Sequence, residues 1–278
     1  MSVVTFWSNG KEQTGKTISM VAIATHIAIE HNYKILMIST AHKNDTLERC
    51  FWKESKQKKN FGLFGPNTNI AMQEGIEGIT KIMRSNRLTP ERITNYSKII
   101  FKGRLEVLPN YKGNEENYKR ISSSYPDIIN LANNYYDLVF VDLDSELEEE
   151  TKNKIINNSD LIIANISQRL ASIDKFIELK SEIPVLDTKK TIVLVGRHDR
   201  FSKYTAKNIS RYMKEKNNVS TIPYNTLFFE ACEEATVPDF FLRLRKIGED
   251  DRNGAFIKEV KRAADNIIYR LQDLNMKR

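Results

Sequence analysis

The 278-residue chain has few of the features that mark secreted or membrane proteins. It contains two cysteines, Cys50 and Cys232, whose separation matches neither a disulfide framework nor a zinc-binding motif. No apolar run approaches the roughly 20 residues that a transmembrane helix needs, and the first residues do not resemble a signal peptide. We therefore expect a cytoplasmic protein whose cysteines are small buried hydrophobic residues.

The charge of the chain leaves its partners open. The formal net charge is +7, from 43 basic and 36 acidic residues, and 40% of all residues are hydrophobic. These values predict a globular protein with enough apolar residues for one sizeable core. The positive balance suits a nucleic acid or an anionic membrane as partner, but a Lys-, Asn- and Ile-rich composition is also what AT-rich coding produces.

A glycine-containing turn follows directly on the first apolar run. Residues 3–7 favour a β-strand, and a helical pattern of apolar residues opens at Thr17. The turn between them, Gly10 to Thr17, reads G-x-x-x-x-G-K-T, the phosphate-binding loop. Its backbone N–H groups bind phosphate oxygens, and the next helix adds its positive end. Lys16 is placed to reach the β- and γ-phosphates and the Thr17 hydroxyl to bind Mg²⁺, so the sequence predicts a nucleotide-binding protein.

Strand and helix patterns alternate along the whole chain. This alternation predicts an α/β fold with a doubly wound, mostly parallel sheet flanked by helices, and ligands at the carboxyl ends of the strands. We find no internal repeat and no long linker, so we expect one domain over residues 1–278. Strands are expected at 3–7, 33–40, 105–109, 137–144, 161–166, 191–195 and 220–223, and helices include 17–28, 72–83, 118–136, 227–235 and about 255–274.

Two carboxylates follow the apolar strand at residues 138–141. Asp142 ends this strand in the manner of a Walker B motif, and its carboxylate is expected to hold Mg²⁺ through water opposite Thr17. Asp144, two residues later, is a further carboxylate near the phosphates. It either orients the attacking water or the metal, or it is an exposed acid in a turn.

Lys11 gives the loop a second lysine, and in this the loop resembles the deviant Walker A motif of the MinD/ParA family, in the SIMIBI class of P-loop ATPases. Four later stretches are similar to the motifs of that family and come in the same order. They are LEVLP at 105–109, YDLVFVD at 136–142, SDLIIA at 159–164 and IPYNTLFFEA at 222–231, the last near the adenine in the family.

This resemblance implies the P-loop NTPase fold, ATP or ADP with Mg²⁺ as cofactors, and a nucleotide-dependent homodimer in which Lys11 reaches the phosphates of the partner. It implies a catalytic role for Lys11, and metal binding by Thr17 and Asp142. The catalytic role expected for Asp144 rests on its position and not on the resemblance. The nucleotide-binding residues that the resemblance implies are Gly10, Lys11, Gln13, Thr14, Gly15, Lys16, Thr17, Ile18, Arg197, Pro223 and Asn225.

The chain departs from the family pattern at four places, one of which is Asp144, where the family usually has a proline. Glu12 and Gln13 replace two glycines, which alters the close interface of a face-to-face dimer. The second strand runs into Ala41 where the family has the acid that positions water, and Gly196-Arg197 stands where the family has an asparagine. We therefore expect slow hydrolysis and leave the base selectivity open.

The last helix, at about 255–274, carries an apolar stripe with basic residues mostly beside it. Such a helix either packs on its own domain or lies on an anionic membrane, which would place the protein at the inner face of the membrane. Arg243, Arg245 and Lys246 just before it could form part of a nonspecific DNA surface.

The resemblance leaves three functions open. The first is a nucleotide-switched positioning or assembly factor, with a protein partner in a membrane-associated apparatus, as in the Tad/Flp pilus branch. The second is a DNA-partition ATPase, and the third is a scaffold that binds nucleotide without hydrolysing it.

Overall fold

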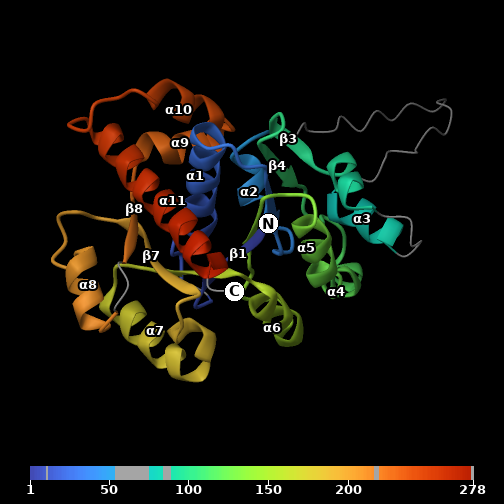
Figure 1. Ribbon diagram of the computed structural model, residues 1–278, viewed down its shortest axis with the longest axis horizontal. Coiled ribbons are helices and arrows are strands. Elements are labelled where there is room, and N and C mark those ends of the chain that lie inside the picture. The colour runs from blue at the N-terminus through green and yellow to red at the C-terminus, as the bar shows by residue number, and fades with distance from the viewer. Residues whose placement is uncertain (11, 54–74, 84–88, 216–218, 277–278) are drawn as a thin grey trace.

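The computed structural model describes residues 1–10, 12–53, 75–83, 89–215 and 219–276 (Figure 1). Its strands form one eight-stranded sheet in the order β3-β4-β2-β5-β1-β6-β7-β8. All neighbours are parallel except β3 and β4, so the predicted α/β class is confirmed. The strands are β1 (Ser2–Ser8), β2 (Ile35–Ser39), β3 (Lys98–Phe101), β4 (Leu105–Leu108), β5 (Leu138–Asp142), β6 (Leu161–Ile166), β7 (Thr191–His198) and β8 (Ser220–Pro223).

Helices cover both faces of the sheet (Figure 1). One face packs on α1, α2, α9, α10 and α11, and the other on helices α3 to α8. Their bounds are α1 (Lys16–Glu30), α2 (Thr46–Arg49), α3 (Gly75–Met83), α4 (Glu115–Ser122), α5 (Tyr125–Asn133), α6 (Glu149–Asn158), α7 (Leu170–Glu182), α8 (Ala206–Tyr212), α9 (Thr226–Glu234), α10 (Val237–Leu244) and α11 (Arg252–Met276), with short 3₁₀ turns η1 (Pro90–Asn95) and η2 (Pro184–Asp187).

The central strand β1 is buried on both sides. Val4 and Phe6 face the core that contains α1 and α11, whereas Val3 and Trp7 face the opposite core. Successive side chains of a strand point to opposite faces, so a strand between two helical layers needs an almost unbroken apolar run. This is why residues 3–7 are recognisable as a strand from the sequence.

The order of the strands reverses beside β1. This strand lies between β5 and β6, and the chain builds the sheet first on the β5 side and then on the β6 side. The loops after β1, β2, β5 and β7 leave the same edge of the sheet because these strands are parallel. In open α/β sheets such a reversal point is where ligands bind.

The structure differs from the sequence prediction in two elements. The antiparallel strand β3 was not predicted, because it is a short edge strand with partly exposed side chains and lacks a buried apolar run. The helix expected over 118–136 is two helices, α4 and α5, and the second has Pro126 in its first turn. Residues 72–74 of the helix expected at 72–83 lie outside the described residues.

The C-terminal helix α11 spans the expected stretch and begins three residues earlier, at Arg252. Its apolar stripe is buried against α1, α10 and β8. In this conformation the stripe is therefore not free to enter a membrane surface. Among the helices of the described residues, none combines the length and apolarity needed to cross a bilayer.

Candidate functional site

The loop after β1 has the backbone of a phosphate-binding turn. Gly10 and Gly15 have φ angles of 88° and 74°, a region that L side chains rarely adopt. Helix α1 begins at Lys16, directly after Gly15. A Cβ at Gly15 would also stand 3.2 Å from the Arg197 side chain. Backbone conformation and space both account for glycine at this position.

Lys16, Thr17 and Asp142 form a compact polar cluster beneath the loop. The Lys16 ammonium lies 3.0 Å from Asp142 Oδ1 and also donates to the carbonyl oxygen of Leu143. The Thr17 hydroxyl donates to Asp142 Oδ2 at 2.8 Å. Asp142 is buried at the end of β5, and its register with Phe6 of the adjacent β1 brings it under the loop. The sequence predicted this convergence.

A cavity of about 360 Å³ opens over the loop. Ten of the predicted site residues line it, together with six residues that were not predicted to bind nucleotide or metal. The predicted ones are Gly10, Gln13, Thr14, Gly15, Lys16, Thr17, Ile18, Asp142, Asp144 and Arg197, and the others are Ser8, Glu12, Ala41, Asn44, Thr46 and Ser145. Lys11 lies outside the described residues.

Glu12 and Gln13 tie the loop to two other strand ends. The Ser167 hydroxyl, just after β6, donates to Glu12 Oε2 at 3.1 Å. Arg197 Nη1, in β7, donates to Gln13 Oε1 at 3.3 Å. The side chains that replace the two glycines therefore both accept hydrogen bonds from other strands' residues. The carboxylate of Glu12 borders the cavity.

The end of β7 approaches the loop closely. A Cβ at Gly196 would stand 2.0 Å from the carbonyl oxygen of Thr14, so only glycine fits there without a shift of the loop. The next residue, Arg197, has a φ of 51°, and the pairing of β7 with β8 is irregular at this point. The Gly196-Arg197 pair is recognisable in the sequence as a departure from the family, but the space that Gly196 provides for the loop is visible only in the structure.

In the described part of the segment after β2, residues 40–53, no carboxylate lines the cavity. Ala41 lines the cavity, whereas Asp45 lies beside Arg49, 3.6 Å away, and is not among the lining residues. The Thr40 hydroxyl accepts a hydrogen bond from the backbone N–H of Asp144 at 2.8 Å. Asp144 lines the cavity, and its Oδ1 accepts from the backbone N–H of Glu146 at 3.2 Å. Asp144 is thus the acid that the structure holds beside Asp142.

An aromatic stack supports this segment. The ring of His42 lies on the ring of Tyr118, with centroids 4.4 Å apart and 12° between the planes. The Tyr118 hydroxyl donates to the Thr40 carbonyl at 2.5 Å. Burial is the main cause that raises the pKa of Tyr118 well above its usual value, so this hydroxyl stays a donor. The stack connects α4 to the residues beside Asp144.

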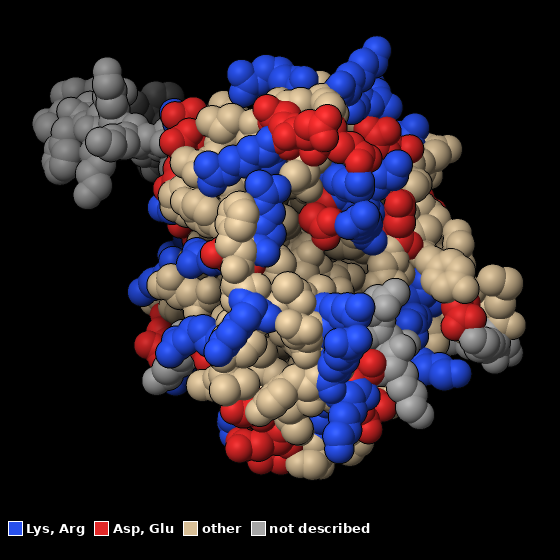
Figure 2. Space-filling view, turned by 90° about the vertical axis from the view of Figure 1, so that its left-hand side faces the viewer, with Lys and Arg blue, Asp and Glu red and all other residues tan. Residues whose placement is uncertain are grey.

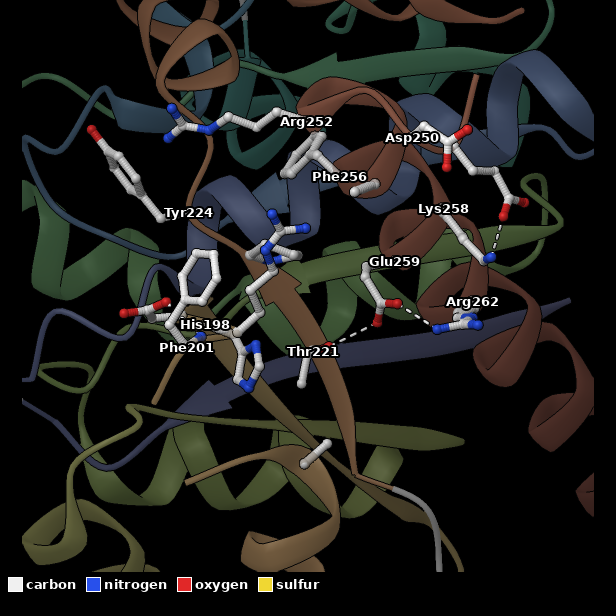
Figure 3. Close-up of a pocket in the computed structure, with 16 residues that line it drawn as sticks. His198, Phe201, Thr221, Tyr224, Asp250, Arg252, Phe256, Lys258, Glu259 and Arg262 are labelled. Carbon is white, nitrogen blue, oxygen red and sulfur yellow. Dashed lines mark hydrogen bonds and ion pairs between the residues drawn. The ribbon is translucent and has the colours of Figure 1, made fainter. Parts of the chain in front are cut away.

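A larger cavity of about 1020 Å³ lies at the ends of β7 and β8 and along the first half of α11 (Figure 3). Pro223 and Tyr224 line it, as does His198, the neighbour of Arg197. Burial lowers the pKa of His198, which favours the neutral ring. In the same cavity, Figure 3 shows Thr221, Glu259 and Arg262 linked in a row, with 2.9 Å between Thr221 Oγ1 and Glu259 Oε2.

Asn225 lines neither cavity. Its side chain is buried, and its Oδ1 accepts from the backbone N–H of Phe228 at 2.8 Å, which caps α9. Its Nδ2 donates to Asn253 Oδ1 at 2.9 Å. Of the residues expected near the base, the structure therefore brings Arg197 to the smaller cavity and Pro223 to the larger one, and it engages Asn225 in a helix cap.

Basic residues gather on the face that contains the larger cavity. Figure 2 shows Lys and Arg on both sides of a central hollow. Residues 199–214, the loop before α8 and α8 itself, contain five basic residues and one acidic residue. All five are exposed, namely Arg200, Lys203, Lys207, Arg211 and Lys214. By contrast, Arg245, which was expected in a DNA surface, donates to both carboxylate oxygens of Glu30.

No protein-family model and no curated protein matches the chain. Solved structures do. A ParA family ATPase from Chlorobium tepidum TLS matches with a TM-score of 0.69 at 15% identity, over 95% of this chain and 98% of that chain. MinD from Pyrococcus horikoshii OT3, complexed with Mg-ADP, matches with a TM-score of 0.64 at 13% identity, over 94% and 95%. A McdA–ATP complex from Cyanothece matches with a TM-score of 0.64 at 12% identity, over 96% of each chain.

These similarities extend over nearly the full length of each chain. Low identity combined with high coverage is a likeness of fold. The resemblance predicted from the sequence is confirmed at that level: the chain has the P-loop fold of the ParA and MinD ATPases.

Proposed function

We propose that this chain is a MinD/ParA-like ATPase that binds ATP with Mg²⁺ and acts as a nucleotide-switched positioning or assembly factor. The observation that carries the proposal is the arrangement of Lys16, Thr17 and Asp142 beneath a glycine-containing turn at the reversal point of the sheet. Structures with this fold include complexes with ADP and with ATP.

The donor set suits Mg²⁺ with a triphosphate. Thr17 Oγ1 and Asp142 Oδ2 are two hard oxygen atoms 2.8 Å apart, and Mg²⁺ prefers oxygen ligands. Bound Mg²⁺ would neutralise charge on the β- and γ-phosphates. The Lys16 ammonium would exchange Asp142 and the Leu143 carbonyl for phosphate oxygens, leaving the Asp142 carboxylate to the metal side.

Arg197 lines the smaller cavity, on the side where we expect the nucleoside to extend. His198, the next residue, lines the larger cavity together with Pro223 and Tyr224. We place the base against Pro223 and the half-exposed ring of Tyr224. Asn225 contributes to this site by holding the first turn of α9, because both ends of its side chain have protein partners.

Hydrolysis is expected to be slow. Among the described residues after β2, no carboxylate lines the cavity. Besides Asp142, the acids that line it are Glu12, which accepts from Ser167, and Asp144, to which we assign the orientation of water. The test of nucleotide binding is calorimetric titration with ATP and Mg²⁺. Lys16→Ala should weaken binding at least tenfold, and Lys175→Ala, which removes an exposed lysine on α7, should leave it unchanged. Equal affinities for the two variants would contradict the proposal.

The switch is tested by the mass of the protein in solution. Light scattering with ADP, ATP or a slowly hydrolysed analogue, each with Mg²⁺, should give a mass that doubles only with the triphosphate. Lys11→Ala should abolish the doubling, since the resemblance assigns Lys11 to the phosphates of the partner. A mass that does not change with the nucleotide, although nucleotide still binds, would favour a scaffold instead.

Two alternatives for the function differ in what the protein would position, a membrane-associated apparatus or DNA. A cytoplasmic factor for a pilus or secretion apparatus, acting beside the inner face of the membrane, predicts a protein partner and no DNA binding. A DNA-partition ATPase predicts sequence-independent binding that weakens with salt. The exposed basic residues of the stretch 199–214 are the observation that supports the DNA-partition alternative (Figure 2).

DNA binding is tested with matched pairs of basic residues on two helices. The double variant Lys207→Ala, Arg211→Ala removes two basic side chains of α8. The double variant Lys119→Ala, Arg120→Ala removes two basic side chains of α4 that form ion pairs with glutamates. If DNA binds at α8, only the first double variant should lose affinity, and its salt slope should fall by about 2. Equal losses in both variants, or no binding at all, would exclude partition through this surface.

A further inference from the structure

The two cysteines of the chain lie on segments that contact each other in the fold, at the end of α2 and in α9. Cys50 ends α2 and Cys232 lies in α9, and both thiols belong to the core on the α1 side of the sheet. Cys50 is 0% exposed and Cys232 is 4% exposed. Burial alone would make them two ordinary small core residues, as the sequence suggested, but their proximity gives them a chemistry that single buried thiols lack.

Contacts on both sides of the cysteines hold the two segments together. Arg49, next to Cys50, lies 3.2 Å from both carboxylate oxygens of Glu233, next to Cys232. The Cys50 carbonyl oxygen accepts from the backbone N–H of Val237 at 3.4 Å. The thiols themselves interact, and this interaction is the largest cause that raises the pKa of Cys50 well above its usual value, followed by burial.

We propose that Cys50 and Cys232 are a modification site, at which a two-electron oxidant such as hydrogen peroxide forms an intrachain disulfide that joins α2 to α9. One thiolate attacks a peroxide oxygen, and the O–O bond breaks to give a sulfenic acid and water. The second thiolate attacks that sulfur, the S–S bond forms, and the S–O bond breaks to release a second water. Two thiols thus lose two hydrogens, and the peroxide is reduced to two waters.

Access of the oxidant requires opening of α2. This helix has four residues, and one-turn helices open at low cost. While α2 is closed, both thiols are buried and the raised pKa of Cys50 disfavours its thiolate, so oxidation proceeds only from the opened segment. The disulfide then prevents the same opening, because it links the end of α2 covalently to α9.

The proposed disulfide lies next to the smaller cavity, over the phosphate-binding loop. The Cys50 thiol donates to the Thr46 carbonyl at 3.2 Å, and Thr46 and Asn44 line that cavity. Oxidation removes this donor and fixes the segment that carries both residues. The inference rests on the fold and on the thiol contact, and it holds whether or not the proposed ATPase function does.

The test uses the full chain, which contains only these two cysteines. Folded protein is treated with hydrogen peroxide, then denatured and alkylated, and its intact mass is measured by mass spectrometry. We expect a mass loss of about 2 Da with no alkylation, no chain-to-chain crosslink, and full recovery of both alkylation sites after dithiothreitol. Cys50→Ser and Cys232→Ser should each abolish the mass loss. The oxidised chain should unfold at a higher temperature, by on the order of 10 °C, because the link closes a long loop.

Four outcomes would overturn the inference. Both sites could stay alkylatable under conditions that oxidise the urea-unfolded chain. The mass could rise through sulfinic acid, or the crosslink could form between chains. A disulfide that forms but lowers the unfolding temperature would also overturn it, because such a bond would have to distort the fold.

Discussion

Gly196 in β7 lies against the carbonyl oxygen of Thr14 in the phosphate-binding turn, so closely that a Cβ at 196 would stand 2.0 Å from that oxygen. This contact limits how closely β7 can approach the turn. It also explains why glycine precedes Arg197, whose guanidinium donates to Gln13 of the same turn.

Replacing this glycine should therefore disturb the turn. Gly196→Ala should lower the free energy of unfolding by about 1–3 kcal/mol and weaken ATP binding, because the added methyl group displaces backbone. Urea unfolding and calorimetry measure the two effects. Gly248→Ala is the matched control, since a Cβ there meets nothing within 4 Å. Similar behaviour of the two variants would mean that the turn tolerates the shift.

Glu12 places a negative charge at the edge of the cavity. Glu12→Gln keeps an oxygen for the Ser167 hydroxyl and removes the charge. ATP should then bind about three- to tenfold more tightly at low salt, with a smaller gain at high salt, because repulsion between like charges is lost. Glu178→Gln, on α7, controls for the change in net charge. An unchanged or weaker affinity of Glu12→Gln would show that the carboxylate does not oppose the phosphates.

Asp144 is the acid that we expect to orient the attacking water. Asp144→Asn preserves an oxygen for the backbone N–H of Glu146, so ATP affinity should change less than threefold. The rate of phosphate release at saturating ATP should fall at least tenfold. Asp45→Asn, whose carboxylate lies beside Arg49 instead, should hydrolyse ATP at the wild-type rate. Unchanged hydrolysis by Asp144→Asn would exclude the role.

Asn225 caps α9, and its substitution separates stability from base binding. Asn225→Ala should lower the free energy of unfolding by about 1 kcal/mol. Asn225→Asp keeps the capping oxygen, and its ATP affinity should stay within about threefold of wild type. Calorimetry gives the affinity and chemical denaturation the stability. A loss of ATP affinity in Asn225→Asp without a loss of stability would mean that the side chain leaves the cap to contact the base.

His26 should make the fold sensitive to mild acid. Burial lowers its pKa below the ordinary 6.5, although Glu30 and Asp265 act in the opposite direction. As the pH falls from about 6.5 toward the folded-state pKa, the unfolded chain takes up a proton that the folded chain does not, so stability decreases. Denaturation between pH 7.5 and 5.5 should show a smaller decrease for His26→Gln. Parallel curves for the two proteins would contradict this assignment.

Much of the fold was predictable from local patterns. The apolar run of β1, the turn from Gly10 to Thr17 and the strand that ends in Asp142 are continuous in sequence, and their chemistry depends on residues within each stretch. Parallel strands bring their carboxyl ends to one edge, so the meeting of Lys16 with Asp142 followed from the pattern as well.

Other features depend on contacts between distant segments. The edge strand β3 lacks a buried apolar run, and the space at Gly196 exists only because the turn packs on β7. Asn225 matches a motif by its place in the sequence, yet its side chain caps a helix and contacts Asn253.

The sequence by itself determined the layered α/β fold and the phosphate-binding turn, because hydrophobic periodicity and glycine conformations act over a few residues. Only the tertiary structure decided which side chains meet across the chain. It joined Glu12 to Ser167 and brought Cys50 to Cys232, since such contacts depend on how helices and strands pack, and not on the residues beside them.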